Sequence, residues 1–211
     1  MHPPLLPVRF DDQPLAGTDL PALRLHGGTV WRWNRPVFDA TGDGHIRIEL
    51  RALPTGPTVA DMAANAAFLV RTTLALADEW DLPSAMPFGA ADANFETAAR
   101  DGLEAEILWP SRESPSPVRR SLAEMARELL PAAARALSAH GVAPDDVQER
   151  LQIVTRRIRT GQTGTAWQRR AVAALEPDLG RDGALVQMVR AFAANSAQGL
   201  PVAEWAGLQP A

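Results

Sequence analysis

The sequence predicts an α+β fold: an antiparallel β-hairpin, part of a larger curved sheet, followed by a mainly helical bundle of about six helices. Residues 28–53 hold two runs typical of strands, joined by the turn-rich segment D-A-T-G-D-G at 39–44. From residue 58 onward, apolar residues recur at helical spacing, and glycine, proline or capping residues separate the runs. Because a lone hairpin is only marginally stable in water, we expect further strands to complete its sheet.

Composition fits a globular protein, with 46% hydrophobic and 22% charged residues in a chain of 211. We expect two parts. Residues 1–56 hold an irregular lead-in and the β-hairpin of the sheet, and residues 57–211 form a helical part that packs on it. Together they make one incomplete domain.

Several classes of chemistry are excluded by residue types that the chain lacks. The 21 basic residues are all arginine, so neither a Schiff base nor a Walker-type lysine can form. Without cysteine there is no disulfide or thiolate catalysis, and the four histidines lie far apart. The arginines are scattered and the net charge is −4, which argues against nucleic acid as a partner. We see no signal peptide and expect no membrane-spanning stretch, so we predict a cytoplasmic protein.

The run H-I-R-I-E-L-R at 45–51 alternates apolar and charged residues, as a strand with two different faces does. The apolar face consists of Ile46, Ile48 and Leu50. On the other face, Arg47 and Arg51 stand about 13 Å apart with Glu49 between them. That spacing suits a polyphosphate with a divalent metal, since arginine binds phosphate oxygens and Mg²⁺ accepts carboxylates. The alternative is an exposed strand face held by salt bridges.

In the first predicted strand, residues 28–38, Arg32 and Asn34 alternate with two tryptophans. This polar pair can line the same surface as the charged face of the second strand, or it can be an exposed face over a tryptophan core. The direction of Arg35 stays open because Pro36 follows it.

The first helix is predicted to run from a capping box at Thr58 and Asp61 to about Trp80. Its apolar stripe, predicted to be core, consists of Val59, Met62, Ala66, Leu69, Val70, Thr73, Leu74 and Ala77. Asp61 and Asn65 are expected to face the hairpin. Further helices are predicted at 90–100, 116–141 with a bend or restart at Pro131, 144–160, 163–176 and 181–197, with a loop at 110–117.

Two smaller features leave alternatives open. The turn G-Q-T-G at 161–164 can bind an anion on its N–H groups, or it can be an ordinary helix–helix junction. His26, in a loop flanked by glycines, can contact a nucleotide or a substrate carboxylate, or it can be a structural hydrogen-bonding residue.

Long runs of this chain resemble the carboxylate-amine ligases of the glutamate-cysteine ligase type. The resemblance is carried by L-R-L-H-G-G-T-V-W-R-W-N-R-P-V-F-D from residue 23 and I-R-I-E-L-R-A-L-P-T-G-P-T-V-A-D-M-A-A-N-A-A-F from residue 46. T-G-Q-T-G-T-A-W-Q from residue 160 and P-V-A-E-W near the end are similar to the C-terminal half of the same family.

The resemblance implies a glutamine synthetase-like fold, in which a curved antiparallel sheet forms an active-site funnel. ATP activates a carboxylate of an amino-acid substrate as an acyl phosphate, which an amine then attacks. The implied cofactors are ATP and Mg²⁺. The implied roles are metal ligand for Glu49 and phosphate binding for Arg47 and Arg51. With the first strand included, the predicted site residues are Arg32, Arg47 and Arg51 for catalysis and Arg47, Arg51, Asn34 and Arg35 for nucleotide binding.

The family's N-terminal half, with its E-x-E strand of metal-binding carboxylates, is not matched. Glu104-Ala105-Glu106 falls in a region predicted to be helical and solvated. We therefore predict the C-terminal half of such a ligase, inactive alone and completed by an N-terminal half or partner subunit, or by homo-oligomerisation. The alternative is a stand-alone module that kept the fold and lost the chemistry.

Overall fold

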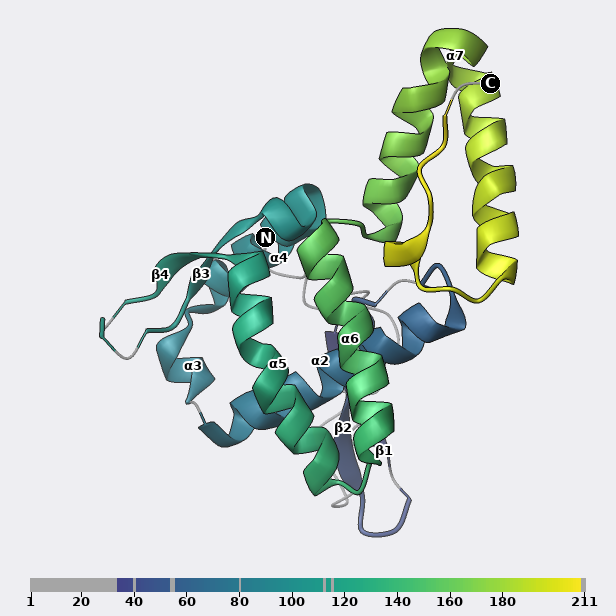
Figure 1. Cartoon of the computed structure of the whole chain (residues 1–211). Helices are drawn as coiled ribbons and strands as arrows, with labels where there is room; N and C mark the ends of the chain where they lie inside the picture. The colour runs from purple at the N-terminus through teal and green to yellow at the C-terminus, as the bar shows by residue number, and fades with distance from the viewer. Residues whose placement is uncertain are drawn as a thin grey trace, which may run out of the picture. The chain divides into compact units, whose positions relative to one another are not determined.

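The computed structural model describes residues 34–39, 41–53, 56–79, 81–111, 113–114 and 116–209 (Figure 1). The chain divides into two compact units, Met1–Pro54 and Thr55–Ala211. The described residues contain two antiparallel strand pairs and several helices, so the predicted α+β class is confirmed.

The first unit contains the predicted hairpin. Strands β1 (Asn34–Asp39) and β2 (His45–Leu50) pair antiparallel and form a two-stranded sheet. Two glycines of the connecting turn, Gly42 and Gly44, have φ of 65° and 74°, which favours glycine because it lacks a Cβ. The predicted strand residues 28–33 lie outside the described part of the chain.

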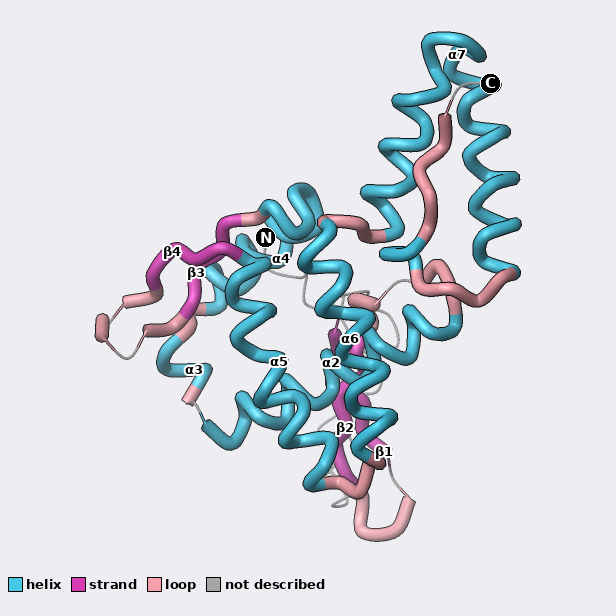
Figure 2. The backbone as a smooth tube through the Cα atoms, in the orientation of Figure 1, coloured by secondary structure: helices cyan, strands magenta, loops and turns pink. Residues whose placement is uncertain are grey.

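Three helices build the central packing of the second unit: α2 (Val59–Glu79), α5 (Leu122–Ala139) and α6 (Pro144–Thr160) (Figure 2). Their buried apolar residues are Ala64, Met125, Ala126, Ala133, Leu137, Val147, Leu151, Ile153 and Val154. The predicted bounds of α6 are confirmed, and α5 continues as one helix through Pro131.

The apolar stripe of α2 was predicted to be core, and this prediction is wrong. Val59 is 76% exposed, and Met62, Val70 and Leu74 are exposed as well. The opposite face packs inward and carries Asp61, Ala64, Phe68 and Thr72. Helical periodicity points to the most apolar face of a helix as its buried face. Here the buried face carries Ala64 and Asp61 instead, and the Asp61 carboxylate can be buried because it pairs with Arg157.

One helix in the described part of the chain is long and apolar enough to cross a membrane, namely Val59–Ala77 with a mean hydropathy of 1.2. The expectation that no stretch would qualify is therefore wrong by length and composition. The same helix supplies Ala64 and Phe68 to the packing against α5 and α6.

A second small sheet was missed. After α3 (Leu82–Ala85), α4 (Phe88–Asp101) and the 3₁₀ turn η1 (Gly102–Glu104), strands β3 (Glu106–Trp109) and β4 (Val118–Ser121) pair antiparallel. The segment 110–117 connects them, so the helix predicted from residue 116 in fact begins at Leu122. Ser121 caps that helix by accepting a hydrogen bond from the Glu124 N–H at 3.3 Å.

Helix α7 (Gly164–Ala197) is a hairpin of two arms. Gly180 breaks the helix with φ 67° and ψ 170°, between the two predicted helices 163–176 and 181–197. The C-terminal segment, with the 3₁₀ turn η2 (Val202–Glu204), runs along both arms (Figure 1). Trp167, Phe192 and Trp205 meet edge to face, with ring centroids 5.2–6.1 Å apart.

Candidate anion and metal site on the hairpin

The register of the hairpin decides which residues share the charged face of β2. Val37 lies opposite Arg47, Asp39 opposite His45, and Arg35 opposite Glu49. Residues directly opposite each other in an antiparallel pair lie on the same face of the sheet. The charged face therefore combines odd-numbered positions of both strands.

Asp39 is a member of this face that the sequence reasoning read only as a turn residue. Its carboxylate accepts hydrogen bonds from the side chain and backbone N–H of Thr41, at 2.5 and 3.0 Å, and from Arg47 at 2.5 Å. These hydrogen bonds, those from Thr41 more than the one from Arg47, hold the pKa of Asp39 well below its usual range. The sequence carried no signal for this role, because it depends on the register across the turn.

Glu49 and Arg51 lie close together at the other end of β2. Arg51 Nε is 3.8 Å from Glu49 Oε1, and the two side chains are 21% and 41% exposed. Arg47 is 56% exposed. The face therefore carries two arginines, each beside a carboxylate, with Arg47 and Glu49 accessible to a ligand.

Of the two alternatives left open for Asn34, the structure does not show the one in which it shares this face. Asn34 pairs with Leu50, so it lies on the apolar face with Ile46 and Ile48. Its side-chain oxygen accepts a hydrogen bond from the backbone N–H of Arg51 at 3.1 Å, which closes the open end of the hairpin. The turn length sets this register, and the length was not evident from the sequence.

Arg35, whose direction the sequence left open, occupies the backbone position opposite Glu49. The two other predicted contact residues, Arg32 and His26, lie outside the described part of the chain. The structure thus brings together Arg47, Glu49 and Arg51 and adds Asp39.

A complete Mg²⁺ site is not formed by the described residues, since they contain no group of three His, Asp or Glu side chains able to hold a metal ion. Glu49 supplies one accessible carboxylate, whereas a Mg²⁺ site bound through protein uses one or two carboxylates together with substrate phosphates. Glu106 begins β3 and is not helical as predicted, but both it and Glu104 are exposed. Glu49 alone does not complete the site.

The second unit holds a buried charged cluster. Asp61 is fully buried, and its carboxylate accepts hydrogen bonds from Thr58 at 2.9 Å and the Val202 N–H at 3.0 Å. Arg157 Nη2 lies 3.1 Å from Asp61 Oδ1, and Arg157 also donates to Asn65 at 2.5 Å. Arg157 therefore engages both Asp61 and Asn65 within the second unit.

The G-Q-T-G turn is a helix–helix junction, one of its two predicted alternatives. Gly161 ends α6 with φ 63°, and the Thr163 side chain caps α7 by accepting from the Ala166 N–H at 3.2 Å. Gln162 donates from its amide to the carbonyls of Val202 and Trp205, both at 2.8 Å. The turn fastens the C-terminal segment.

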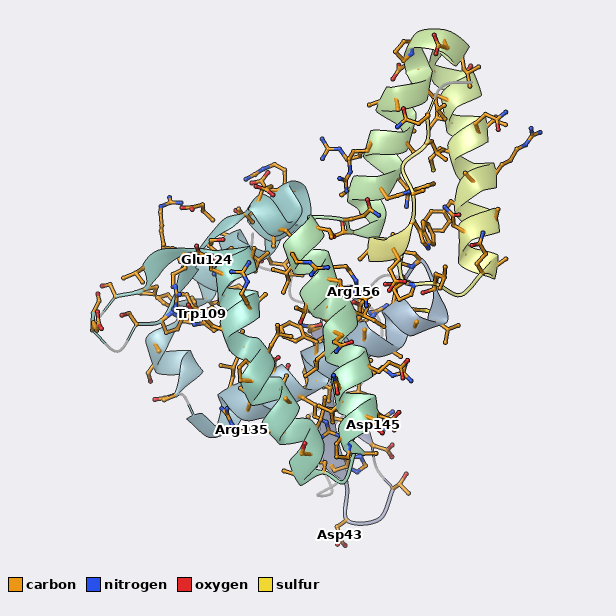
Figure 3. The ribbon with its side chains drawn as sticks, in the orientation of Figure 1. Asp43, Trp109, Glu124, Arg135, Asp145 and Arg156 are labelled. Carbon is orange, nitrogen blue, oxygen red and sulfur yellow. The ribbon has the colours of Figure 1, made fainter. Side chains whose placement is uncertain are left out.

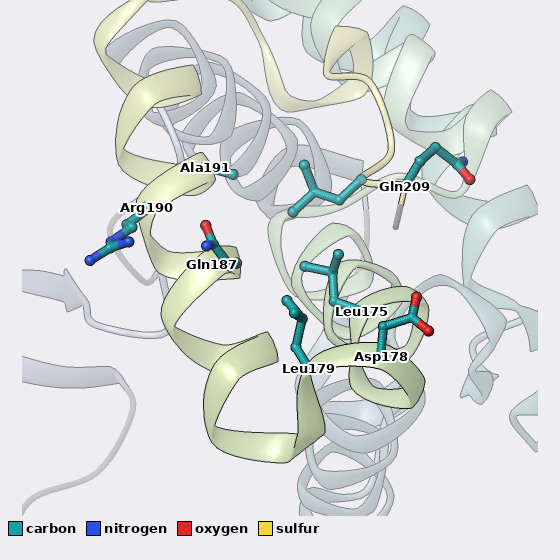
Figure 4. Close-up of a pocket in the computed structure, with 8 residues that line it drawn as sticks. Leu175, Asp178, Leu179, Gln187, Arg190, Ala191 and Gln209 are labelled. Atoms are coloured by element: carbon teal, nitrogen blue, oxygen red, sulfur yellow. The ribbon is translucent and has the colours of Figure 1, made fainter. Parts of the chain in front are cut away.

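A groove of about 610 Å³ lies between the arms of α7 and the C-terminal segment (Figure 4). Its lining is mainly apolar and consists of Leu175, Leu179, Ala191 and Leu208, with Asp178, Gln187, Arg190 and Gln209 around it. Arg190 points away from the two leucines Leu175 and Leu179 (Figure 4). Because the groove surface is mainly apolar, it suggests no particular reaction.

Comparisons with protein-family models, with curated proteins and with solved structures found no match. The family resemblance stays a prediction that rests on the sequence runs quoted above.

Proposed function

We propose that this chain is the C-terminal half of an ATP- and Mg²⁺-dependent carboxylate-amine ligase of the glutamate-cysteine ligase type. The single observation that carries the proposal is the charged face of β2. Arg47 and Arg51 flank Glu49 on a strand whose other face is apolar, as in the R-x-E-x-R strand that the resemblance implies.

The proposed task of the arginines is electrostatic. ATP and a substrate carboxylate are both anionic, and their approach becomes feasible only when cationic groups offset the repulsion. Guanidinium groups are permanently charged and bind phosphate oxygens in pairs, so Arg47 and Arg51 can hold two phosphates of one nucleotide. Bound Mg²⁺ would supply charge neutralisation at the same phosphates.

In this proposal another chain supplies the missing part of the site. Glu49 offers one metal ligand, and the sheet has two described strands, so further carboxylates and strands come from an N-terminal half or a partner subunit. The substrates are then ATP and amino acids. A cytoplasmic location fits a chain without cysteine.

A second candidate is a stand-alone module that kept the fold but lost the chemistry. It is favoured by the contacts within the face: Arg47 is engaged by Asp39 at 2.5 Å, and Arg51 lies beside Glu49. In such a module these pairs serve only to hold the hairpin together, and no nucleotide binds.

Calorimetric titration of MgATP into the full chain separates the two candidates. We expect Arg47→Ala and Arg51→Ala each to weaken binding by about 1.5 kcal/mol or more, roughly tenfold, the usual value of a hydrogen bond between charged groups. Arg150→Ala is the matched control, since Arg150 is an arginine on α6 paired with its neighbour Glu149. Affinity unchanged in both hairpin variants favours the module.

A further inference from the structure

The outer edge of β1 is a poor template for another strand. Pro36 lies in the middle of β1 opposite Ile48 and has no N–H. The backbone hydrogen bonds between β1 and β2 are therefore made by the pairs on either side of it, Arg35 with Glu49 and Val37 with Arg47. Pro36 then leaves a gap among the donors of the outer edge, a common device against strand addition.

The outer edge of β2 has no such gap. In an antiparallel pair, alternate residues direct their N–H and C=O groups toward the partner strand, and the others direct theirs away. The Arg51 N–H points toward β1, where it donates to Asn34. By this alternation Ile46, Ile48 and Leu50 direct their backbone groups to the outer side of β2, which pairs with no strand in the described part of the chain.

One face of this edge strand exposes apolar side chains. Ile46 is 59% and Ile48 is 61% exposed, high values for isoleucine at the centre of a strand. An edge strand that combines open backbone groups with exposed isoleucines is prone to pair with another strand.

The sequence of β2 is complementary to itself when read in the opposite direction. If two copies of β2 pair antiparallel about Ile48, the apolar pairs are Ile48 with Ile48 and Ile46 with Leu50. On the charged face, Arg47 of each copy lies opposite Glu49 of the other. The Arg47–Glu49 pairs are those without backbone hydrogen bonds between the two residues, and in such pairs the cross-strand side chains approach most closely.

We propose that the occupant of this edge is a second copy of the chain, joined through β2 about a two-fold axis at Ile48 into a four-stranded antiparallel sheet. The pairing brings Glu49 of both copies onto one face, as diagonal neighbours about 7–8 Å apart, with an Arg47 beside each. That the second copy thereby completes the nucleotide site rests on the proposed function, whereas the pairing itself does not.

The interface is small. One strand of six residues on each side buries less than the roughly 1,200 Å² of a standard stable interface. Dimerisation is therefore expected to depend on concentration.

Cysteine cross-linking tests the register directly, because the chain contains no cysteine of its own. In Ile48→Cys the two thiols face each other across the axis, with Cα atoms about 5.5 Å apart, within the range that a disulfide spans. In the control Ile46→Cys they lie about 13 Å apart along the strands, although position 46 is equally exposed. We expect a disulfide-linked dimer for Ile48→Cys alone; equal cross-linking of both variants, or none, overturns the proposal.

A charge exchange tests the same pairing without a new bond. It is made in an Asp39→Asn background, which removes the partner of Arg47 within its own chain. Sedimentation velocity should show that Arg47→Glu or Glu49→Arg raises the dimer dissociation constant at least about tenfold, because like charges then face each other twice. Arg47→Glu with Glu49→Arg should restore it. A double variant no better than the single ones contradicts the pairing.

Both experiments are done without nucleotide, so their failure differs from failure of the proposed function. A chain that dimerises as described but does not bind MgATP contradicts only the ligase proposal. A chain that binds MgATP but fails the cross-linking and charge-exchange tests contradicts only the pairing.

Discussion

The residue with the largest structural consequence is Asp61, a carboxylate with no exposed surface. It joins three segments that are far apart in the sequence: its own helix α2, Arg157 near the end of α6, and the backbone of Val202 in the C-terminal segment. Burial lowers the pKa of Arg157, and the nearby charge of Asp61 opposes that shift. The pair depends on both members, since either charge alone would be buried without compensation.

Asp61→Asn is expected to lower the free energy of unfolding by about 3–5 kcal/mol, because it leaves the Arg157 guanidinium unpaired. The matched control is Glu204→Gln, which removes an exposed ion pair with Arg156, a residue marked in Figure 3. That change should amount to no more than about 1 kcal/mol. Urea unfolding of both variants measures the two changes in the free energy of unfolding. Equal, small changes would mean that the buried ion pair does not stabilise the fold.

At the scale of elements, α2 shows how a helix can pack with its less apolar face. Ala64 is fully buried and Val70, on the opposite face, is 39% exposed. Hydrophobicity alone predicts the wrong buried face for α2, because the ion pair between Asp61 and Arg157 allows the face with Asp61 and Ala64 to pack.

Matched glutamine substitutions test this orientation. Ala64→Gln should destabilise the fold by about 1–3 kcal/mol, because the larger side chain overpacks a filled interface. Val70→Gln, on the exposed face, should change stability by about 0.5 kcal/mol or less. Thermal unfolding of the two variants decides; the reverse order of stabilities would show that the apolar stripe is covered.

How far the sequence predicts an element depends on whether local signals agree. The bounds of α6 follow from Pro144 at its first turn and Gly161 after its last, each with one structural meaning. Pro117 lies at the start of the helix predicted from residue 116, but in the structure it precedes strand β4. The residue that caps the helix is Ser121. The alternation of β2 predicted its two faces, but the register that excludes Asn34 and includes Asp39 depends on the turn, which composition does not specify.

At the scale of the whole molecule, the chain consists of two compact units. The second unit is held by helix packing and by the Asp61 cluster, and the surface of the groove between the arms of α7 is mainly apolar. The chemistry that we propose lies on the hairpin of the first unit, where one strand carries two arginines around one carboxylate. In that proposal the face is half of a site, and another chain supplies the rest.

The central claim is that Glu49 helps to hold the metal of a bound nucleotide and is not merely an ion-pair partner of the arginines. The most direct measurement is ATP affinity by calorimetry across a series of Mg²⁺ concentrations, for the wild type, Glu49→Gln and the control Glu128→Gln, an exposed carboxylate paired with Arg120. We predict that Mg²⁺ strengthens binding to the wild type and the control but has much less effect in Glu49→Gln, because the amide lacks the charge that a hard cation requires. Superimposable Mg²⁺ curves for all three proteins would contradict the claim.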